Sequence, residues 1–200
     1  MTSVVDVEFE GVTKTFGKTV ALDDITFGVR KGEFYCLIGP SGCGKTTALR
    51  CIAGLIMPDA GRVLIKGEDM SGVPTHKRPI SMVFQTWALF PHMNVFENVA
   101  FGLKMRGVAE SEIKQRVNEA LGLVRLTGLE NRNPRELSGG QQQRVGLARA
   151  IVLRPEVVLL DEPLGNLDAK LQAQMEIELK LLHKQLGITF VYVTHNQAQA

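Results

Sequence analysis

The sequence contains no run of about 20 apolar residues, the length that a helix needs to cross a lipid bilayer. Its longest strongly apolar runs, such as residues 157–160, are short and end in charged residues. The first six residues also lack the basic segment and apolar run of a secretory signal. We therefore expect a chain that is soluble by itself.

Neither sign of charge is in excess, because 23 Lys and Arg face 21 Asp and Glu, for a formal net charge of +2. This balance gives no electrostatic reason to expect a nucleic-acid partner, so any bound anion must be held by a local site.

Cysteine is scarce. Cys36, Cys43 and Cys51 are odd in number and match no zinc spacing, which favours reduced thiols in a cytosolic protein over a disulfide framework.

What the chain does contain is an alternation of apolar strand-like and helical segments. Hydrophobic residues make up 44% of its 200 residues, enough for a globular domain with a core. Strands are expected at residues 5–10, 25–29, 34–38, 62–65, 157–160 and 188–193, with 34–38 fully buried. Helices are expected at residues 45–53, 141–153 and 169–186, and helical periodicity extends over 94–126. The alternation indicates an α/β domain with a mainly parallel sheet.

A glycine-rich segment between the strand at 34–38 and the helix at 45–53 has the sequence GPSGCGKT. It fits the phosphate-binding pattern G-x-x-x-x-G-K-[ST] in the context that this pattern requires. The glycines allow backbone N–H groups to surround phosphate oxygens, Lys45 would reach the β- and γ-phosphates, and Thr46 would offer its hydroxyl to Mg²⁺. An ordinary glycine-rich turn is the alternative. The predicted nucleotide-binding residues here are Gly39, Pro40, Ser41, Gly42, Cys43, Gly44, Lys45, Thr46 and Thr47.

Two acidic residues, Asp161 and Glu162, stand at the end of the apolar strand 157–160. In an open α/β sheet, ligands bind beyond the carboxyl ends of the strands, where the phosphate loop also lies. We expect Asp161 to hold Mg²⁺, directly or through water, and Glu162 to polarise the water that attacks the γ-phosphate. The alternative is a solvated acidic pair that starts a turn at Pro163.

A more specific motif is LSGGQ at residues 137–141, followed by QQRVGLARA. A Ser-Gly-Gly turn that opens a helix is a second anion-binding helix N-terminus in the chain, although a flexible Ser-Gly loop is the alternative. The motif resembles the signature of ABC transporter ATP-binding subunits. This resemblance implies a head-to-tail homodimer, in which Ser138, Gly139, Gly140 and Gln141 of one subunit cover the ATP held by the other.

Further residues match the family in order. Gln85 resembles its Q-loop glutamine, which the resemblance places near Mg²⁺ and the attacking water. Asp168, in GNLD at residues 165–168, resembles the D-loop aspartate at the dimer interface, and His195 the switch histidine that contacts the γ-phosphate. Phe16 stands where an aromatic side chain usually stacks on adenine, although a core position is the alternative. The resemblance thus implies Glu162, His195, Gln85 and Lys45 as catalytic residues and Thr46, Gln85 and Asp161 as metal ligands.

The resemblance extends from about Val7 to Ala200 and implies a P-loop NTPase: a mainly parallel core sheet, an N-terminal antiparallel β subdomain and an inserted helical subdomain. We expect one ABC ATPase domain over residues 1–200, with the helical insertion at about 94–140. Because the family's domain continues further, we also expect a C-terminally truncated chain with an exposed sheet edge.

The implied function is ATP hydrolysis that energises a membrane importer. PHMNVFENV at residues 91–99 is typical of importer subunits with a regulatory domain, and GITFVYVTH at 187–195 looks closest to polyamine (spermidine/putrescine) importers. Sugar and ferric-iron importers share much of this pattern. Expected partners are permease subunits and a substrate-binding protein, at the cytoplasmic face of the inner membrane. A soluble ABC ATPase that acts on DNA or ribosomes, or a non-enzymatic ATP-sensing module, remains an alternative.

Overall fold

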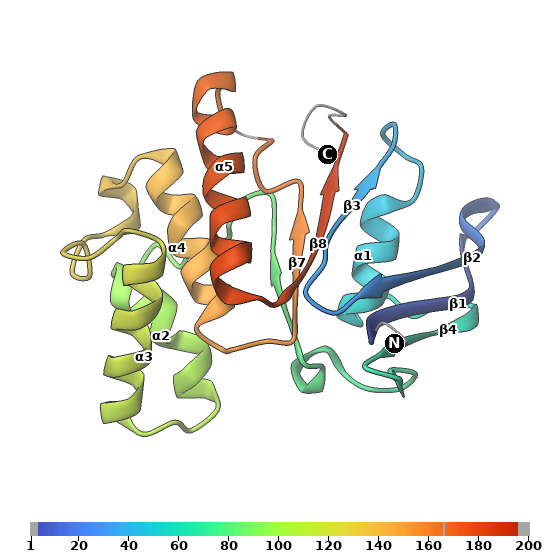
Figure 1. Cartoon of the computed structure of the whole chain (residues 1–200), viewed down its shortest axis with the longest axis horizontal. Coiled ribbons are helices and arrows are strands. Elements are labelled where there is room, and N and C mark those ends of the chain that lie inside the picture. The colour runs from blue at the N-terminus through green and yellow to red at the C-terminus, as the bar shows by residue number, and fades with distance from the viewer. Residues whose placement is uncertain (1–3, 166, 196–200) are drawn as a thin grey trace. The chain divides into compact units, whose positions relative to one another are not determined.

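The computed structural model describes residues 4–165 and 167–195 (Figure 1). The chain divides into two compact units. The first comprises Met1–Met82, Glu156–Glu162 and Gly187–Ala200, and the second comprises Val83–Pro155 and Pro163–Leu186. The first unit contains nearly all of the strand residues and the helix at 45–53, and the second contains the other four α-helices of the described residues.

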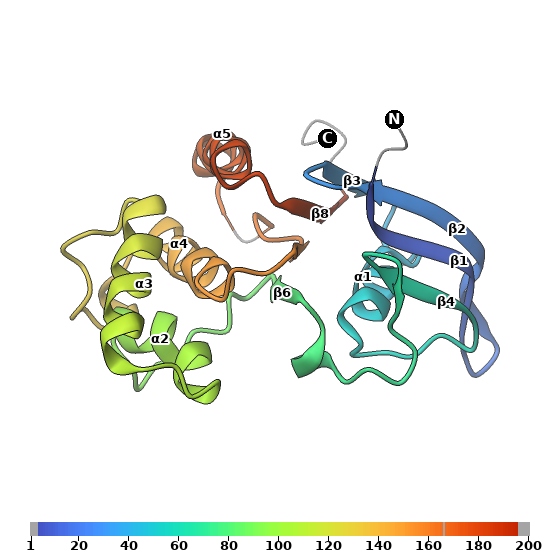
Figure 2. The ribbon, with the colours of Figure 1, turned by 60° about the horizontal axis from the view of Figure 1, so that its bottom comes forward.

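An antiparallel sheet occupies the N-terminal part of the first unit, where its strands lie side by side in both ribbon views (Figures 1 and 2). Its order is β2-β1-β4-β5, with bounds β1 Val5–Phe16, β2 Thr19–Arg30, β4 Ala60–Ile65 and β5 Glu68–Asp69. The first two strands are longer than predicted because bulges interrupt their apolar alternation. At one of them Gly11 has a φ of 59°, and its N–H donates to the Thr26 hydroxyl. The short strand β5 was not predicted.

The second sheet has the order β3-β8-β7-β6. The pairs β3–β8 and β8–β7 are parallel, as predicted. Bounds are β3 Phe34–Ile38, β6 Ile80–Val83, β7 Val157–Asp161 and β8 Thr189–Thr194. The prediction that residues 34–38 are fully buried is wrong for the described chain. Strand β3 lies at the edge of this sheet, and Ile38 is 44% exposed. Strand β6 was not predicted, since its four residues are too few to show a period.

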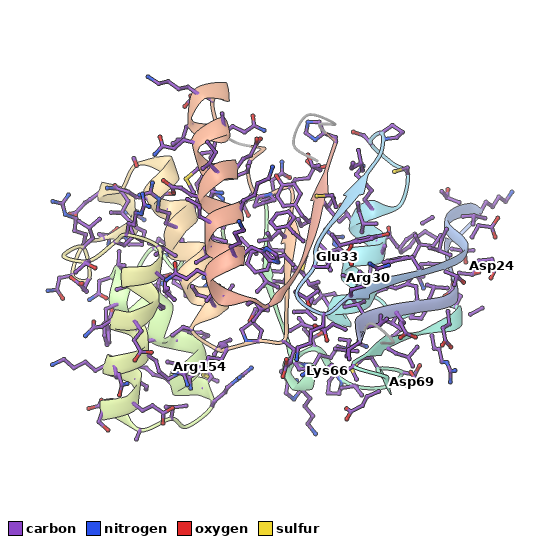
Figure 3. The ribbon with its side chains drawn as sticks, viewed as in Figure 1. Asp24, Arg30, Glu33, Lys66, Asp69 and Arg154 are labelled. Atoms are coloured by element: carbon purple, nitrogen blue, oxygen red, sulfur yellow. The ribbon has the colours of Figure 1, made fainter. Side chains whose placement is uncertain are left out.

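The core of the first unit lies where helix α1 (Lys45–Ala53) meets both sheets. Leu49 and Ile52 of α1, Leu159 and Val191 of the parallel sheet and Phe9 of the antiparallel sheet are all nearly or completely buried in it. The turn that leads from β2 into β3 is closed by the Arg30 N–H, which donates to the Glu33 carboxylate over 2.8 Å (Figure 3). The packing of α1 against both sheets fixes the position of its first residue, and with it the position of the glycine-rich segment that precedes the helix.

The second unit is built from helices α2 Val95–Met105, α3 Glu110–Leu123, α4 Gly139–Ile151 and α5 Ala169–Leu186. The predicted helix start at Asn94 is confirmed, because Asn94 and Glu97 form a reciprocal capping box. The predicted apolar face of α3 is also confirmed, since the side chains of Ile113, Val117 and Leu121 are buried. The described residues also form single 3₁₀ turns at Pro134–Glu136 in this unit and at Thr75–Lys77 in the first unit. Within the described ranges no helix has the length and apolarity of a membrane span.

The Asp59 carboxylate joins the turn before β4 to the end of β1. It accepts hydrogen bonds from the Lys14 ammonium, the Thr15 N–H and the Thr15 hydroxyl, each at 2.7–2.8 Å. The Lys14 bond, then those from Thr15, hold the pKa of Asp59 at about 2, below its ordinary value of 3.8. The lowered pKa means that Asp59 stabilises the fold above its ordinary pKa and that this contribution disappears as the pH falls from about 4 to about 2.

We expect Asp59→Asn to reduce the free energy of unfolding at neutral pH, and the difference from wild type to shrink as the pH falls through that window. Urea unfolding at a series of pH values measures this. Asp23→Asn, which removes an exposed carboxylate from β2, is the control for the loss of one negative charge. A difference between Asp59→Asn and wild type that stays constant from pH 6 to pH 2 contradicts the assignment.

Candidate active site

The glycine-rich segment 39–44 joins the end of β3 to the start of α1. Gly44 occupies the N-cap position of α1 with a φ of 91°, and no side chain caps this helix. A Cβ at Gly44 would overlap the carbonyl oxygen of Ala21, so only glycine fits there. The N–H groups in the first turn of a helix have no partner within the helix. The loop therefore ends on an uncapped, positively polarised helix N-terminus, which suits a phosphate group.

Lys45 is almost completely buried beside this loop, although it carries a charge. Its ammonium donates to the carbonyl oxygens of Gly39 and Pro40, both over 2.8 Å, and lies 3.7 Å from the Cys43 sulfur. No carboxylate of the described chain forms an ion pair with it. A buried cation that is held only by neutral acceptors favours an anion as a further ligand.

Thr46 and Asp161 are brought together from positions 115 residues apart. The Thr46 hydroxyl donates to Asp161 Oδ1 over 3.0 Å at the end of β7. Burial raises the pKa of Asp161, and the Thr46 hydrogen bond offsets part of that rise. A hydroxyl and a carboxylate are hard oxygen donors, and Mg²⁺ is usually held by one or two such groups together with water and substrate phosphates. The pair therefore fits the predicted Mg²⁺ site.

Glu162 and His195 also meet, because they follow neighbouring strands. Asp161 of β7 is paired with Val193 of β8, and the Glu162 N–H donates to the Val193 carbonyl over 3.1 Å. Glu162 Oε2 lies 3.3 Å from His195 Nδ1. Glu162 has a φ of 45°, a left-handed conformation that is strained for a residue with a side chain. Strain of this kind persists where surrounding contacts impose it, and it is frequent at functional sites.

The signature residues form the start of α4 in the second unit. The Ser138 hydroxyl accepts from the Gln141 N–H over 3.3 Å, and Gln141 Oε1 accepts from the Ser138 N–H over 2.9 Å. This capping box excludes the flexible-loop alternative. Because Gly139 and Gly140 have no side chains, α5 and the turn before it can approach the start of α4 closely. A Cβ at Gly140 would lie 3.2 Å from the Leu171 side chain.

The remaining predicted residues have the following positions. Gln85 is exposed in the segment after β6. Asp168 caps α5, since its Oδ1 accepts from the N–H groups of Lys170 and Leu171. Phe16 is 49% exposed at the end of β1, with the Lys14 ammonium 5.5 Å from its ring centroid. The alternative that Phe16 is a core residue is therefore wrong. Asn166 of the predicted D-loop and residues 196–200 lie outside the described residues.

The predicted site residues thus fall into two groups, one in each unit. The first unit contains the glycine-rich loop with Lys45 and Thr46, the carboxylates of Asp161 and Glu162, and His195. The second contains Gln85, the signature residues 138–141 and Asp168. The sequence reasoning missed Arg149 and Asn98, which hold the segment after Gln85 through hydrogen bonds to its backbone. Asn98 is buried and Arg149 is half-buried, and both stand inside segments whose periodicity predicted helices.

A separate cavity of about 70 Å³ lies within the helical unit. Its walls come from α3, α4 and α5 and include the Arg144–Glu178 ion pair. Drug-sized ligands occupy pockets of roughly 300–1,000 Å³, so this cavity is too small for a nucleotide. The glycine-rich loop therefore remains the candidate active site.

The chain is similar to known proteins over most of its length. A family model described as ABC transporter matches residues 22–165. The spermidine/putrescine import ATP-binding protein PotA of Rubrobacter xylanophilus is 58% identical over 98% of this chain and 52% of its own length. PotA of Nitrosospira multiformis is 57% identical over 97% of this chain and 53% of its own length. The chain spans about half the length of these curated relatives.

Two solved structures are similar over nearly the whole chain. The bacterial ABC transporter cassette MJ0796, solved as a dimer, is 34% identical with a TM-score of 0.82, covering 97% of this chain and 90% of its own. The protein cbiO1 of Clostridium perfringens, part of the transporter complex cbiONQ, is 30% identical with a TM-score of 0.88, covering 96% of this chain and 79% of its own. The predicted fold class is confirmed by these structures.

Proposed function

Because the chain belongs to the ABC transporter family, we propose that it binds and hydrolyses ATP as the energising subunit of a membrane importer. The observation that carries the proposal is the arrangement at the strand ends of the first unit. There the pair Thr46–Asp161 and the pair Glu162–His195 belong to the same unit as a glycine-rich loop that contains a buried lysine. These are the groups that phosphoryl transfer to water requires.

In the proposed reaction, the loop 39–44 and Lys45 hold the phosphates by backbone N–H groups and by charge. Thr46 and Asp161 would hold Mg²⁺, which would neutralise charge on the phosphate oxygens. Glu162 accepts a hydrogen bond from the attacking water and orients it toward the γ-phosphate. His195, whose Nδ1 lies 3.3 Å from the Glu162 carboxylate, keeps that carboxylate in position, and its imidazole contacts the γ-phosphate. Phe16 offers an exposed ring on which adenine stacks.

The proposal includes a homodimer. Each chain has one loop of the Lys45 type, and its signature helix α4 presents a second N-terminus with no phosphate loop of its own. In the dimer, residues 138–141 of one subunit complete the site of the other, and Asp168 lies at the contact between them. Gln85 joins the site near the attacking water. The dimeric structure of the similar cassette MJ0796 supports this assembly.

The proposed cargo is a polyamine, supported by relatives whose names specify spermidine and putrescine import. The chain itself would not contact the cargo, which permease subunits and a substrate-binding protein would handle. It would attach to the permease at the cytoplasmic face of the membrane. Affinity purification from cells tests this placement: recovery with a permease supports it, whereas recovery with ribosomes or DNA contradicts it.

We expect Mg²⁺-dependent ATP hydrolysis by the purified chain to show a rate per subunit that rises with protein concentration, because only the dimer contains complete sites. A concentration series with a phosphate-release assay measures this, and equilibrium dialysis with labelled ATP measures binding separately. Lys45→Ala is the control that should lose ATP binding. Turnover per subunit that is independent of concentration would contradict the dimer, and a chain that binds no ATP would contradict the proposed function.

A further inference from the structure

The small cavity of the helical unit opens onto a wider groove at the ends of α3 and α5. The groove has a volume of about 550 Å³ and is lined by Glu119, Gly122, Leu123, Arg125 and Gln185, three of which also line the cavity. The apolar walls of the cavity are the side chains of Leu123, Leu147, Met175, Leu181 and Leu182. Since a cavity of about 150 Å³ holds a benzene molecule, one of about 70 Å³ has room for the end of one aliphatic side chain.

The charged side chains around the groove compensate one another, with one exception. Arg144 donates two hydrogen bonds to the Glu178 carboxylate, over 2.9 and 2.8 Å. The Glu119 carboxylate pairs with Arg154 over 3.4 Å. Within the described residues, the Arg125 guanidinium forms neither an ion pair nor a hydrogen bond. The groove therefore has one uncompensated positive charge, which an acidic partner would complement.

Arg125 also has a backbone conformation that glycine usually adopts. Its φ is 57°, its N–H donates to the Gly122 carbonyl over 3.1 Å, and the Leu126 N–H donates to the Leu121 carbonyl over 2.9 Å. These two bonds form the Schellman motif that ends α3, in which the left-handed position is most often a glycine, because a side chain is strained there. Strain of this kind is frequent where a side chain has a function. The guanidinium at the groove is the feature that a glycine could not supply.

An apolar strip on α5 leads out of the cavity. Leu181 lines the cavity and is 53% exposed, and Ile177, four residues earlier, is 62% exposed. Residues four apart lie on the same face of a helix, so the two side chains are neighbours. Adjacent exposed apolar side chains beside a groove are typical of a protein contact, whereas single ones are common on any surface. A small molecule in the cavity would not cover this strip, so the surface favours a polypeptide.

We propose that the groove is a docking site for a partner protein that inserts one aliphatic side chain into the cavity and places an adjacent Asp or Glu against Arg125. Burial of the aliphatic side chain supplies most of the affinity, and the carboxylate fixes the direction of the bound segment. The groove lies within the helical unit and includes none of the residues proposed for ATP hydrolysis. The inference therefore goes beyond the proposed function and does not depend on it.

Selection from a displayed library of random seven-residue peptides on the immobilised chain tests the partner chemistry. We expect the enriched sequences to share a Leu, Ile or Met next to an Asp or Glu. The most enriched peptide, synthesised with a fluorescent label, then gives a dissociation constant by fluorescence polarisation. Its binding should weaken as the salt concentration rises, because the carboxylate pairs with an exposed guanidinium.

Two cations in the left-handed conformation provide a matched pair of variants. We expect Arg125→Gly to weaken binding of the peptide by about 5-fold, the effect of one partly exposed charge pair. Its urea unfolding midpoint should stay near that of wild type, because glycine adopts this φ without strain. Lys66→Gly makes the same change of charge at a φ of 54° in the first unit (Figure 3) and should leave peptide binding unchanged.

A blocking variant tests where the peptide binds. Gly122 lines the groove inside α3, and outside its own stretch of helix nothing lies within 4 Å of the position that its Cβ would occupy. Gly122→Phe therefore fills the groove without displacing a neighbour. It should weaken peptide binding by about 10-fold or more, because the aliphatic side chain is no longer buried. Gly122→Ala, which leaves the groove open, should bind as wild type does.

The outcomes decide between this partner and the other occupants of the groove. Enrichment of no sequence over the uncoated support overturns the proposal, as does equal binding by wild type, Arg125→Gly and Gly122→Phe. Enrichment of apolar sequences without an acid, with binding unchanged in Arg125→Gly, overturns the acidic partner. Self-association without nucleotide that Gly122→Phe abolishes, together with no enriched peptide, assigns the groove to a second copy of the chain instead. If Gly122→Phe does not fold, as judged by circular dichroism, Arg125→Gly decides.

Discussion

Glu162→Gln should lower ATP turnover by about 10²- to 10⁴-fold, the range that a general base contributes. The two side chains have nearly the same shape, so the variant keeps the left-handed backbone and a polar contact with His195. The amide carries no negative charge and cannot polarise the attacking water as the carboxylate does. ATP binding depends on the loop 39–44 and Lys45, and we expect it to remain. The variant should therefore accumulate as an ATP-bound dimer.

Phosphate release measures the turnover of this variant, and size-exclusion chromatography with ATP measures the dimer. Glu156→Gln is the matched control. It makes the same chemical change in the same unit, at an exposed carboxylate whose 2.7 Å ion pair with Lys66 lies at the start of β7. We expect its turnover to equal that of wild type. If turnover by Glu162→Gln also equals wild type, Glu162 is not the base.

Arg78→Met should lower the free energy of unfolding by about 2–4 kcal/mol. Arg78 is almost completely buried, and its guanidinium donates to four backbone carbonyls of the first unit, those of Cys51, Ile52, Met70 and Val73. Cys51 and Ile52 lie in the last turn of α1, so Arg78 holds the carboxyl end of the helix whose other end forms the phosphate loop. Methionine fills similar volume but leaves these acceptors unpaired.

Burial lowers the pKa of Arg78, but an arginine remains protonated, so the hydrogen bonds are charge-assisted. Part of the stability that these hydrogen bonds contribute is offset in Arg78→Met, because the variant no longer buries a cation. Unfolding in urea measures the difference. Arg154→Met is the control, since this side chain is 68% exposed (Figure 3) and its replacement should change stability by less than about 0.5 kcal/mol. An equally small change for Arg78→Met would show that the carbonyls find other partners.

Local sequence patterns predicted most of the helices and strands because each pattern acts over a few residues. The bounds of β3, α1 and α5 were predicted to the residue, since a strong apolar period ends there at glycine or proline. Strand β6 and the full lengths of β1 and β2 were not predicted. Their formation depends on neighbouring strands and on bulges, which a single segment does not reveal.

The burial of β3 is a second property that its own sequence could not predict. Its five apolar residues predict a strand, but whether a strand is buried on both sides depends on its place in the sheet. In the described chain β3 is an edge strand, and its residues are half-buried or exposed. The composition of a strand therefore predicted its existence and not its surroundings.

The sequence by itself determined which chemistry the chain contains: a glycine-rich phosphate loop, two acids at the end of an apolar strand, a signature motif and a histidine. Each is a short contiguous pattern whose residue types have a direct chemical meaning. Only the tertiary structure placed Thr46 at 3.0 Å from Asp161 and His195 at 3.3 Å from Glu162, because these contacts depend on strand order. It also assigned Arg78, Arg149 and Trp87 their partners, which are backbone carbonyls that no residue pattern specifies.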